Sequence, residues 1–209
     1  TFGDNMIATS SFQSQSVPLL HIISQVVPDL PILFIDTGYH FPETLAFRDR
    51  LTQAFGLNVR TLKPEPRRDL SVQKRGELYQ VNPDLCCFIN KIKPFQKAKK
   101  NFNAWVTGIR HDQTQERANT PVFSRDEIGF YKICPMMIWT RKDMWAYIEE
   151  YDLPVHPLLA QGYLSIGCAP CTRPVQQDES EREGRWVDQD KNECGLHVSL
   201  LIEEEIEEE

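Results

Sequence analysis

The chain has 209 residues, of which 41% are hydrophobic, 25% charged and 10% aromatic, and this composition excludes a disordered or collagen-like chain. The length suits one large domain, or a domain with an appendage. Six glutamates at 203–205 and 207–209 account for most of the formal charge of −7, and without them the chain carries only −1. Such an acidic run repels itself, so we expect a solvated tail on a nearly neutral body.

Charge and hydropathy also limit the partners. A basic patch lacks interleaved aromatic residues, which favours a small anionic ligand over a nucleic-acid polymer. No apolar run approaches the roughly 18 residues that span a bilayer, and no secretion signal is visible, so we expect a cytoplasmic protein without a membrane contact. The sequence begins at Thr1 rather than Met, which suggests that an N-terminal segment is missing. The basic patch consists of Lys91, Lys93, Lys97, Lys99 and Lys100.

The first part of the chain alternates strands and helices. Pro18 suits the first turn of a helix that Ser16 is positioned to cap. The apolar run at 31–37 is typical of a buried parallel strand, and Gly56 marks the end of the next helix. In chain order we expect a strand at 6–12, a helix at 17–27, a strand at 31–37, a helix at 42–55 and a strand at 58–62.

The second part continues the alternation and then loses regularity. Pro94 should kink a long helix, and Thr140 with Asp143 resembles a capping box. Beyond Pro154 no regular element is expected. In chain order we expect a helix at 83–100, strands at 104–109 and 130–134, and a helix at 140–151.

Strands and helices joined by short connections predict an α/β fold, a parallel sheet with helices on both faces. Ligands of such sheets bind beyond the carboxyl ends of the strands, here residues 10–13, 36–38 and 108–110. We expect one structural domain, consisting of an α/β body over 1–161 and an irregular appendage over 162–209 that folds over this edge and ends in a mobile tail.

Cysteine clusters in a cytosolic chain are more often metal-binding or catalytic than disulfide-bonded. The spacing of Cys168 and Cys171 lets both thiolates face one metal, although it equally fits a redox pair or half a zinc site. The adjacent Cys86 and Cys87 suit separate iron corners of a cubane better than one tetrahedral zinc. These four cysteines therefore predict one [4Fe-4S] cluster, the alternative being that Cys86 and Cys87 are small apolar helix residues.

The other two cysteines differ in their surroundings. Cys134 lies in an apolar strand segment and is expected in the core. Cys194 has polar neighbours and is expected to be exposed, close to arginines and a histidine that favour its thiolate form. Such a cysteine is a candidate nucleophile.

Further short motifs accompany the cysteines. They are Ser10-Ser11-Phe12, Asp36-Thr37-Gly38, Phe41-Pro42-Glu43-Thr44, Gly108-Ile109-Arg110 with Gln113, Thr172-Arg173-Pro174, Glu181-Arg182-Glu183-Gly184-Arg185-Trp186 and Glu193-Cys194-Gly195-Leu196-His197. Together with the cysteines they closely resemble the assimilatory sulfonucleotide reductases over nearly the whole chain. The resemblance is to the cluster-containing adenylyl-sulfate reductase branch, which is close to the phosphoadenylyl-sulfate reductases.

This resemblance implies a fold like that of the adenine nucleotide alpha hydrolases and PP-loop enzymes, with a nucleotide bound by the body. It implies reduction of adenylyl sulfate to sulfite and AMP in sulfate assimilation. The Cys194 thiolate would attack the sulfate sulfur, forming an S-sulfocysteine from which thioredoxin, or glutaredoxin, releases sulfite. The cluster would not pass electrons but would orient Lys91 and tune the charge near the sulfate.

The resemblance also assigns substrate-binding positions. Cations must offset the charge of the anionic substrate and of the leaving group. The four that match phosphosulfate-binding positions are Lys91, Arg110, Arg182 and Arg185. The remaining expected substrate contacts are Ser10, Ser11, Phe12, Asp36, Thr37, Gly38 and His197, of which His197 would touch the substrate or favour the thiolate.

Several alternatives stay open. The same reaction on the 3'-phosphorylated nucleotide, or on both nucleotides, fits the motifs as well. An ATP-pyrophosphatase or tRNA-thiolating enzyme shares the expected fold, but residues 10–16 lack the glycines of its pyrophosphate-binding nest. A non-enzymatic zinc module is a further alternative. A homo-oligomer is compatible with the sequence. The first loop also lacks the Gly-Ala-Glu-Asp of many reductases, and His111 replaces a usual Arg or Lys.

Overall fold

The computed structural model describes residues 5–65, 78–187, 189 and 191–197, so the glutamate run lies outside the described residues. Its centre is a six-stranded sheet in the order β3-β2-β1-β4-β6-β5. The pairings among β1, β2, β3, β4 and β6 are parallel, and β5 pairs antiparallel with β6. The strands are β1 Met6–Thr9, β2 Ile32–Ile35, β3 Val59–Leu62, β4 Ala104–Thr107, β5 Phe123–Arg125 and β6 Tyr131–Ile133.

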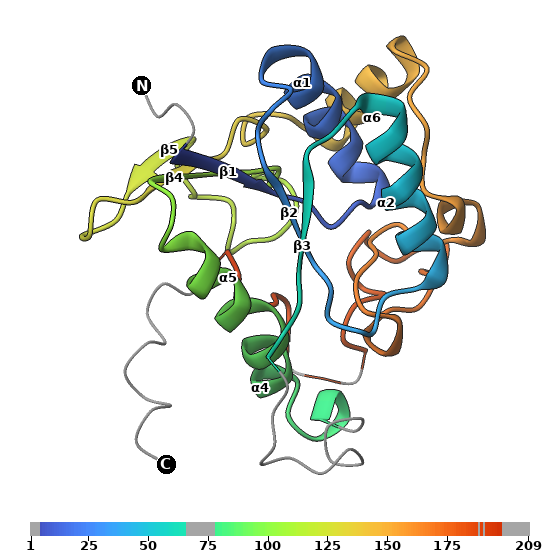
Figure 1. Cartoon of the computed structure of the whole chain (residues 1–209). Coiled ribbons are helices and arrows are strands. Elements are labelled where there is room, and N and C mark those ends of the chain that lie inside the picture. The colour runs from blue at the N-terminus through green and yellow to red at the C-terminus, as the bar shows by residue number, and fades with distance from the viewer. Residues whose placement is uncertain (1–4, 66–77, 188, 190, 198–209) are drawn as a thin grey trace.

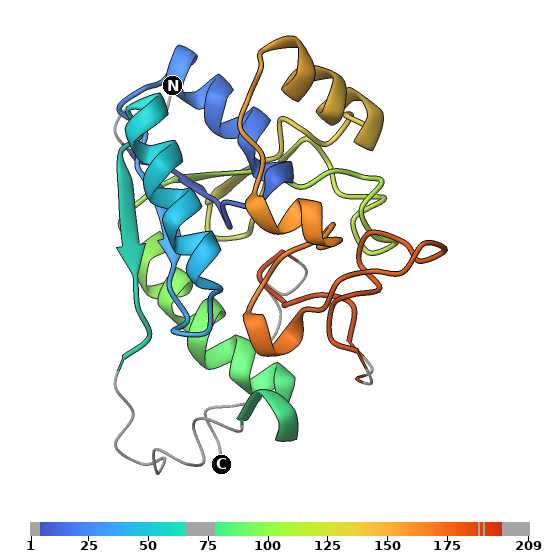
Figure 2. The same cartoon turned by 90° about the vertical axis from the view of Figure 1, so that its right-hand side faces the viewer.

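Helices cover both faces of this sheet, as Figures 1 and 2 show. α1, α2 and α6 lie on one side, and the helix that contains α4 and α5 lies on the other. The predicted α/β class with helices on both faces is therefore confirmed. The helices are α1 Val17–Val26, α2 Pro42–Phe55, α4 Pro83–Cys87, α5 Lys93–Lys99 and α6 Arg141–Glu150.

The two-residue period of the strands divides the core into two layers. Ala8 and Phe34 face α1, α2 and α6 in the larger buried cluster. Ile7 directly precedes Ala8 in β1 and therefore points to the opposite face, where it packs with Trp105 of β4 and Phe95 of α5. Because both faces of the sheet are buried, β2 consists of apolar residues alone, as the run at 31–37 predicted.

The expected kink at Pro94 takes the form of a π-helical turn. Residues Phe88–Ile92 form this turn between α4 and α5, and the Lys93 amide donates to the Phe88 carbonyl five residues back. Pro94 then lies in the first turn of α5, directly after the π-helical turn, where the regular α-helical hydrogen-bond pattern is already interrupted. Such turns are frequent at functional sites, and this one carries Lys91.

The sequence signals for helix ends and strands predicted some of these elements correctly and others not. Thr140 and Asp143 form the complete capping box, and Gly56 ends α2 in the left-handed conformation with φ 65°. Ser16 makes no side-chain cap bond, because residues Ser14–Ser16 already form a short 3-10 turn that runs into α1. β5 was not predicted, since three residues with half-exposed or exposed side chains give no periodic pattern.

The stretch beyond Gly162 is irregular, as expected. In its described part the regular element is the 3-10 turn Ala169–Cys171. An isolated bridge joins His40 to Cys168, and the Ala169 amide donates to the Tyr39 carbonyl at 2.7 Å. These contacts fold the appendage over the carboxyl ends of the strands. Among the described residues, no helix is both long and apolar enough to cross a membrane.

Candidate active site

A cavity of about 160 Å³ lies at the carboxyl ends of β1 and β4, and appendage residues, among them Gly167, Arg185 and Cys194, form part of its wall. Ser10 and Ser11 contribute to its wall after β1, and Gly108 and Ile109 contribute after β4. The segment 191–197, which we name the strap, forms another wall. The charged, thiol or imidazole side chains that line the cavity are His40, Lys91, Arg117, Cys168, Arg182, Arg185, Glu193, Cys194 and His197.

The first loop owes its shape to Phe12. This residue has a positive φ of 53° and is 0% exposed, with its ring edge-on to Phe34 at 5.7 Å. The Phe12 amide donates to Ser10 Oγ at 3.1 Å. Phe12 thus anchors the loop in the core and lies outside the cavity lining, whereas Ser10 and Ser11 line it.

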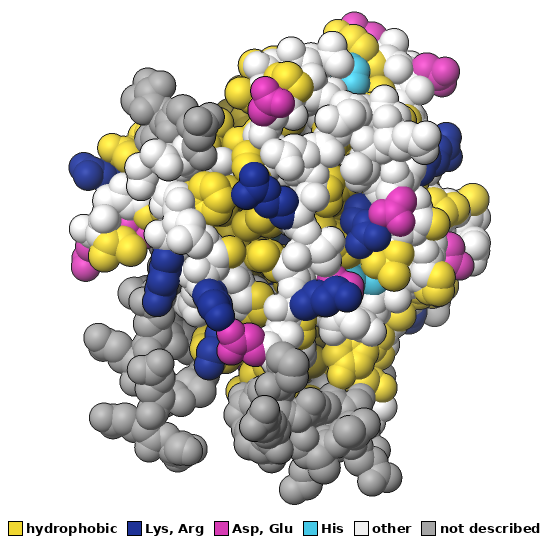
Figure 3. Space-filling model, in the orientation of Figure 1, with side chains coloured by type: hydrophobic (Ala, Val, Ile, Leu, Met, Phe, Trp, Pro, Cys, Tyr) yellow, Lys and Arg dark blue, Asp and Glu magenta, His cyan; other side chains and the backbone are white. Residues whose placement is uncertain are grey.

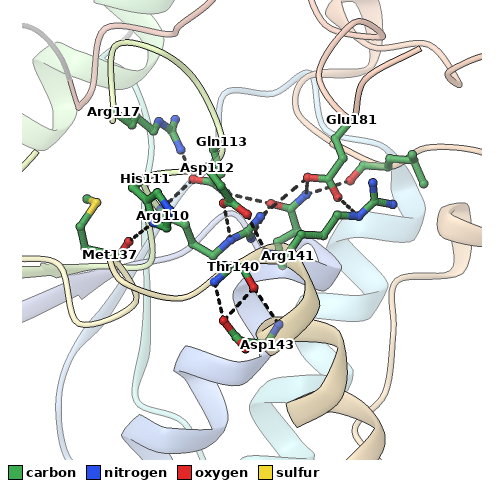
Figure 4. Close-up of polar contacts among 12 residues, drawn as sticks. Arg110, His111, Asp112, Gln113, Arg117, Met137, Thr140, Arg141, Asp143 and Glu181 are labelled. Carbon is green, nitrogen blue, oxygen red and sulfur yellow. Dashed lines mark hydrogen bonds and ion pairs between the residues drawn. The ribbon is translucent and has the colours of Figure 1, made fainter. Parts of the chain in front are cut away.

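Arg110 is buried behind the cavity wall and is 1% exposed. Its Nε donates to Asp112 at 2.9 Å and one terminal nitrogen donates to Gln15 at 3.1 Å. The other terminal nitrogen lies 3.8 Å from Glu181. Figure 4 shows these partners converging from separate segments. Arg110 is not among the described residues that line the cavity. It instead orients two that do, Gln15 and Gln113.

Gln113 connects Arg110 to the cavity, which its side chain lines. Its Oε1 accepts from the Arg110 amide at 3.0 Å and also from Arg117, while its Nε2 donates to Gln15 at 2.8 Å. Burial raises the pKa of Glu181, although Arg141 and Arg110 oppose this rise. Two glutamines and two ion-paired residues thereby fix one side of the cavity.

Arg117 and Arg182 both face the cavity, and sequence reasoning missed Arg117. Arg117 donates to Glu193 Oε2 at 2.7 Å, and a terminal nitrogen of Arg182 lies 3.4 Å from the same oxygen. Arg182 also donates to the Asn192 carbonyl at 2.8 Å. Burial lowers the pKa of Arg182 to about 10, with Glu193 acting in the opposite direction. The Arg182 guanidinium therefore remains charged at neutral pH.

Arg185 reaches the cavity beside Gly167. A Cβ on Gly167 would lie 2.2 Å from an Arg185 terminal nitrogen, so only glycine leaves room for this guanidinium. The Arg185 guanidinium carbon lies 4.3 Å from the centre of the Trp186 ring. Trp186 itself has a positive φ of 49°. Stacking on a buried indole restricts Arg185 to one orientation.

Cys194 is half-buried and lines the cavity, although its polar neighbours predicted an exposed thiol. The next residue, Gly195, has φ 81°, and a Cβ there would lie 2.8 Å from Ile92. The strap therefore turns sharply against the π-helical segment immediately after the cysteine. This turn brings the thiol to the same cavity as Lys91, Arg182 and Arg185.

His197 lines the cavity two residues beyond that turn. Its ring stacks on Trp105 with the ring centres 5.3 Å apart, and its carbonyl accepts from Lys132 Nζ at 3.0 Å. Burial holds the pKa of His197 well below its usual value, and the nearby Arg117, Lys132 and Arg182 lower it further. The imidazole is therefore neutral, so any cationic support for a Cys194 thiolate comes from other residues.

The four remaining cysteines that were paired from sequence line one small pocket next to the cavity. Lys91 and Thr37 line this cysteine pocket as well. Thr37 Oγ1 lies 3.3 Å from Cys168 Sγ, and Asn90 Nδ2 donates to Cys86 Sγ at 3.5 Å. The cysteines are Cys86, Cys87, Cys168 and Cys171. Cys134, in contrast, is 0% exposed in the core, as predicted.

The loop after β2 faces the cysteine pocket rather than the cavity. Asp36 Oδ1 accepts from the Gly38 amide at 3.0 Å, and Gly38 has φ 79°. These contacts turn the chain so that Thr37 reaches Cys168. Among the described residues that line the cavity, Asp36, Thr37 and Gly38 are absent. The expected loop at 36–38 thus lies beside the cysteines, whereas Ile35 at the end of β2 lines the cavity together with the ends of β1 and β4.

Lys91 borders both sites. Burial alone would lower the pKa of Lys91, but electrostatic interaction with the neighbouring cysteines, Cys168 above all, raises it above its usual value. Lys91 thus stays charged between the cysteine pocket and Cys194. Figure 3 shows further Lys and Arg side chains across the middle of one face of the molecule, with hydrophobic atoms between them. An anion that approaches this face meets positive charge, although the whole chain is acidic.

The cysteine pocket fits a cluster better than one ion. Among the described residues, no group of three or more His, Cys, Asp or Glu is arranged to hold a metal ion. A single zinc requires its thiolates at about 2.3 Å from one point. A four-iron cluster spreads its four thiolates over separate iron corners, and four cysteines from two distant segments surround this pocket.

Comparison with known proteins agrees with this arrangement. A family model described as "Phosphoadenosine phosphosulfate reductase domain" matches residues 5–174. The adenosine 5'-phosphosulfate reductase of Streptomyces coelicolor is 42% identical over 199 residues, which cover 94% of this chain and 84% of that protein. The protein of the same name from Mesorhizobium japonicum is 44% identical over 202 residues, covering 96% and 79%.

Solved structures show the same fold. The phosphoadenylyl-sulfate reductase of Candida auris, in a phosphate complex, superposes with a TM-score of 0.65 at 30% identity, covering 79% of this chain and 82% of that one. The FMN adenylyltransferase of Candida glabrata superposes with a TM-score of 0.59 at 16% identity, covering 87% and 62%. At that identity the second likeness concerns the fold alone.

Proposed function

This chain belongs to the family of phosphoadenosine phosphosulfate reductase domains, and from that premise we propose that it reduces adenosine 5'-phosphosulfate to sulfite and AMP. The relatives at 42% and 44% identity that bear the name of this activity span most of the chain. The reaction belongs to sulfate assimilation and takes place in the cytoplasm, with thioredoxin or glutaredoxin as the reductant.

The observation that carries this proposal is the position of Cys194. Its thiol shares one cavity with Lys91, Arg182 and Arg185 at the carboxyl ends of the strands. A thiolate that attacks the sulfate group of a phosphosulfate anhydride approaches an anion, and the departing AMP gathers negative charge. Fixed cations at this point lower the energy of both.

Two displacements complete the reaction. The Cys194 thiolate forms a bond to the sulfate sulfur, whose bond to the phosphate oxygen breaks, and AMP departs with the electron pair. A thioredoxin thiolate then attacks Cys194 Sγ and expels sulfite. The second thioredoxin thiol resolves the mixed disulfide, which restores Cys194 and leaves thioredoxin oxidised. Thioredoxin supplies both electrons.

Within this reaction the cavity residues have separate tasks. Lys91, Arg182 and Arg185 bind the phosphosulfate, and Ser10 and Ser11 offer hydroxyl groups beside the nucleotide. His197 contacts the substrate as a neutral imidazole. Arg110, Phe12 and the loop Asp36-Thr37-Gly38 support these positions from behind the wall. The body over 1–161 binds the nucleotide, and the segment 162–209 contributes the second cysteine pair and the nucleophile.

We propose that Cys86, Cys87, Cys168 and Cys171 hold one [4Fe-4S] cluster. The common pocket of these four thiols supports this assignment. When bound, the group supplies charge and rigidity beside Lys91. Chemical analysis of anaerobically purified protein should find about four iron and four sulfide per chain. Stoichiometric zinc without sulfide would instead favour a zinc site.

The same reaction on the 3'-phosphorylated nucleotide is the second candidate. The description of the family and the Candida auris enzyme, at 30% identity, both refer to that substrate. An ATP-pyrophosphatase, which would release pyrophosphate from ATP, is a more distant candidate. Supplying each of the three nucleotides in turn distinguishes these activities.

Replacement of Cys194 provides the decisive test. Cys194→Ser should abolish sulfite formation from adenosine 5'-phosphosulfate with thioredoxin under anaerobic conditions, because serine cannot form the S-sulfonate. Cys134→Ser, which alters a buried thiol that does not line the cavity, provides a matched control. Undiminished activity of Cys194→Ser would contradict the mechanism.

Replacement of Lys91 tests the electrostatic part. Lys91→Ala should slow formation of the S-sulfocysteine about 100-fold, since one preorganised donor typically contributes this much to a rate. Single-turnover mass spectrometry measures the sulfonated fraction of Cys194, and cluster absorption should remain intact. Equal rates in both proteins would remove the proposed role of Lys91.

A further inference from the structure

Glu193, directly before Cys194, places its carboxylate among three donors from other segments. Thr114 Oγ1 donates to Oε1 at 3.0 Å, and Arg117 donates to Oε2 at 2.7 Å. Arg182 lies 3.4 Å from the same oxygen. Only 8% of the Glu193 side chain is exposed, as is 8% of the Arg117 side chain. This carboxylate is thus a buried, multiply bonded anion rather than a solvated surface charge.

The other strap contacts are weaker or lie farther from the thiol. The Asn192 carbonyl accepts one hydrogen bond from Arg182, and the His197 carbonyl accepts one from Lys132. Lys191, whose side chain is only 6% exposed, pairs with the largely exposed Asp84 and lies over the Trp186 ring, but it precedes Cys194 by three residues. Among these contacts, that of Glu193 is the one made by the residue next to Cys194, and it involves two charged groups, Arg117 and Arg182. Hydrogen bonds between charged groups are stronger than those between neutral groups.

We infer that Glu193 is a positioning residue, whose carboxylate clasps the strap to Arg117, Arg182 and Thr114 and so holds Cys194 inside the cavity. The inference rests on the proposed role of Cys194 as the nucleophile. Attack on the bound sulfonucleotide requires the strap in this closed position. Attack by thioredoxin on the sulfonated cysteine requires a thiol that a protein can reach, and therefore a strap that has left the cavity.

The clasp therefore acts oppositely on the two displacements. Removing the charge of Glu193 weakens closure, which slows sulfonation of Cys194 and leaves sulfite release by thioredoxin unchanged or faster. A residue that only maintained the fold would slow both steps together. This separation distinguishes positioning of the strap from general damage.

The test compares Glu193→Gln with Glu179→Gln in the full-length, cluster-containing protein. Glu179 also pairs with an arginine of the appendage, Arg173, at 2.6 Å, but it does not line the cavity, so it is a matched control. Peptide mass spectrometry measures the rate at which iodoacetamide alkylates Cys194 without substrate. Cys134, at 0% exposure, reports any loss of the fold.

We expect Glu193→Gln to be alkylated at Cys194 roughly tenfold faster than the parent, in line with the loss of a charged hydrogen-bond network. Glu179→Gln should react at the parent rate, and Cys134 should stay unmodified. Thr114→Val, which removes a single bond from the carboxylate, should give a smaller increase. Parent-like alkylation of Glu193→Gln would overturn the inference.

Single-turnover experiments with adenosine 5'-phosphosulfate complete the test. Glu193→Gln should be sulfonated more slowly, whereas pre-sulfonated protein should release sulfite to thioredoxin at least as fast as the parent. Equal slowing of both steps would also overturn the inference. Failure of the parent to become sulfonated would contradict the proposed function instead, and the alkylation rates would still decide whether Glu193 clasps the strap.

Discussion

The body and the appendage with its strap are held together by different forces. In the body, strand residues such as Ile7 and helix residues such as Leu51 are 0% exposed and pack in two apolar layers. The strap is held largely by polar contacts, namely the Glu193 carboxylate, the Lys191–Asp84 pair and a few carbonyl hydrogen bonds. One stacked ring and one apolar residue, Leu196 packed on the second core layer, add to them. Apolar burial is diffuse and cooperative, whereas a few polar contacts can be broken singly. The molecule thus combines a rigid binding surface with a nucleophile on a releasable segment.

The largest expected effect comes from damage to the body. Leu51→Ala should lower the free energy of unfolding by about 2–5 kcal/mol, because it removes buried methyl groups and leaves a cavity. Urea denaturation followed by circular dichroism measures this loss. The rate of Cys194 alkylation at low urea should remain that of the parent. A faster rate would show that the strap depends on the core packing around α2.

A second prediction concerns His156, a buried histidine within the body. His156 is 0% exposed, its Nε2 lies 3.0 Å from Thr44 Oγ1, and its amide donates to Ser14. Burial lowers its pKa to about 4. Between pH 6.5 and this value the unfolded chain binds a proton that the folded protein excludes. Stability should therefore fall with decreasing pH, by up to about 1.4 kcal/mol per pH unit.

Urea denaturation at several pH values between 7.5 and 5 measures this slope. His156→Gln removes the titrating group and should give a shallower dependence below pH 6.5. An identical slope in both proteins would show that other groups cause the acid sensitivity. Comparison of Cys194 alkylation over the same range would show whether the strap and the body lose their order together.

The smallest expected effect is that of salt on the strap. Raising the ionic strength from about 0.05 to 1 M should increase alkylation of Cys194 only two- to threefold, roughly, because buried pairs are screened less than exposed ones. Cys134 in the core should stay unreactive. A decrease in the Cys194 rate with salt would contradict an ionic clasp and indicate an apolar one.

The sequence predicted the parts of the fold that depend on local patterns. Apolar strands, the Gly56 end of α2 and the capping box at Thr140 all have signals within a few residues. The π-helical turn before Pro94 was not foreseen, since it depends on how the whole helix packs. The sequence did not predict β5, because its place at the sheet edge is set by pairing with β6 rather than by its own residues.

The site was predicted to a similar degree. Cysteine spacing predicted the group of four that lines one pocket. The family resemblance indicated Cys194 together with three cations that line the cavity, Lys91, Arg182 and Arg185. Arg117 and its partner Glu193 are 76 residues apart, so no local pattern connects them. Arg110 was identified as important, but its burial behind the wall depends on Asp112 and Glu181, whose positions only the folded chain defines.

The stack of His197 on Trp105 has a practical consequence. The indole is fixed in the sheet, because its N–H donates to Thr9 at 2.8 Å, and the last described residue of the strap covers its face. Departure of the strap would expose this indole to water and shift its emission to longer wavelength. The chain thus contains a native optical probe, through which stopped-flow fluorescence can follow the opening and closing of the strap during turnover without an added label.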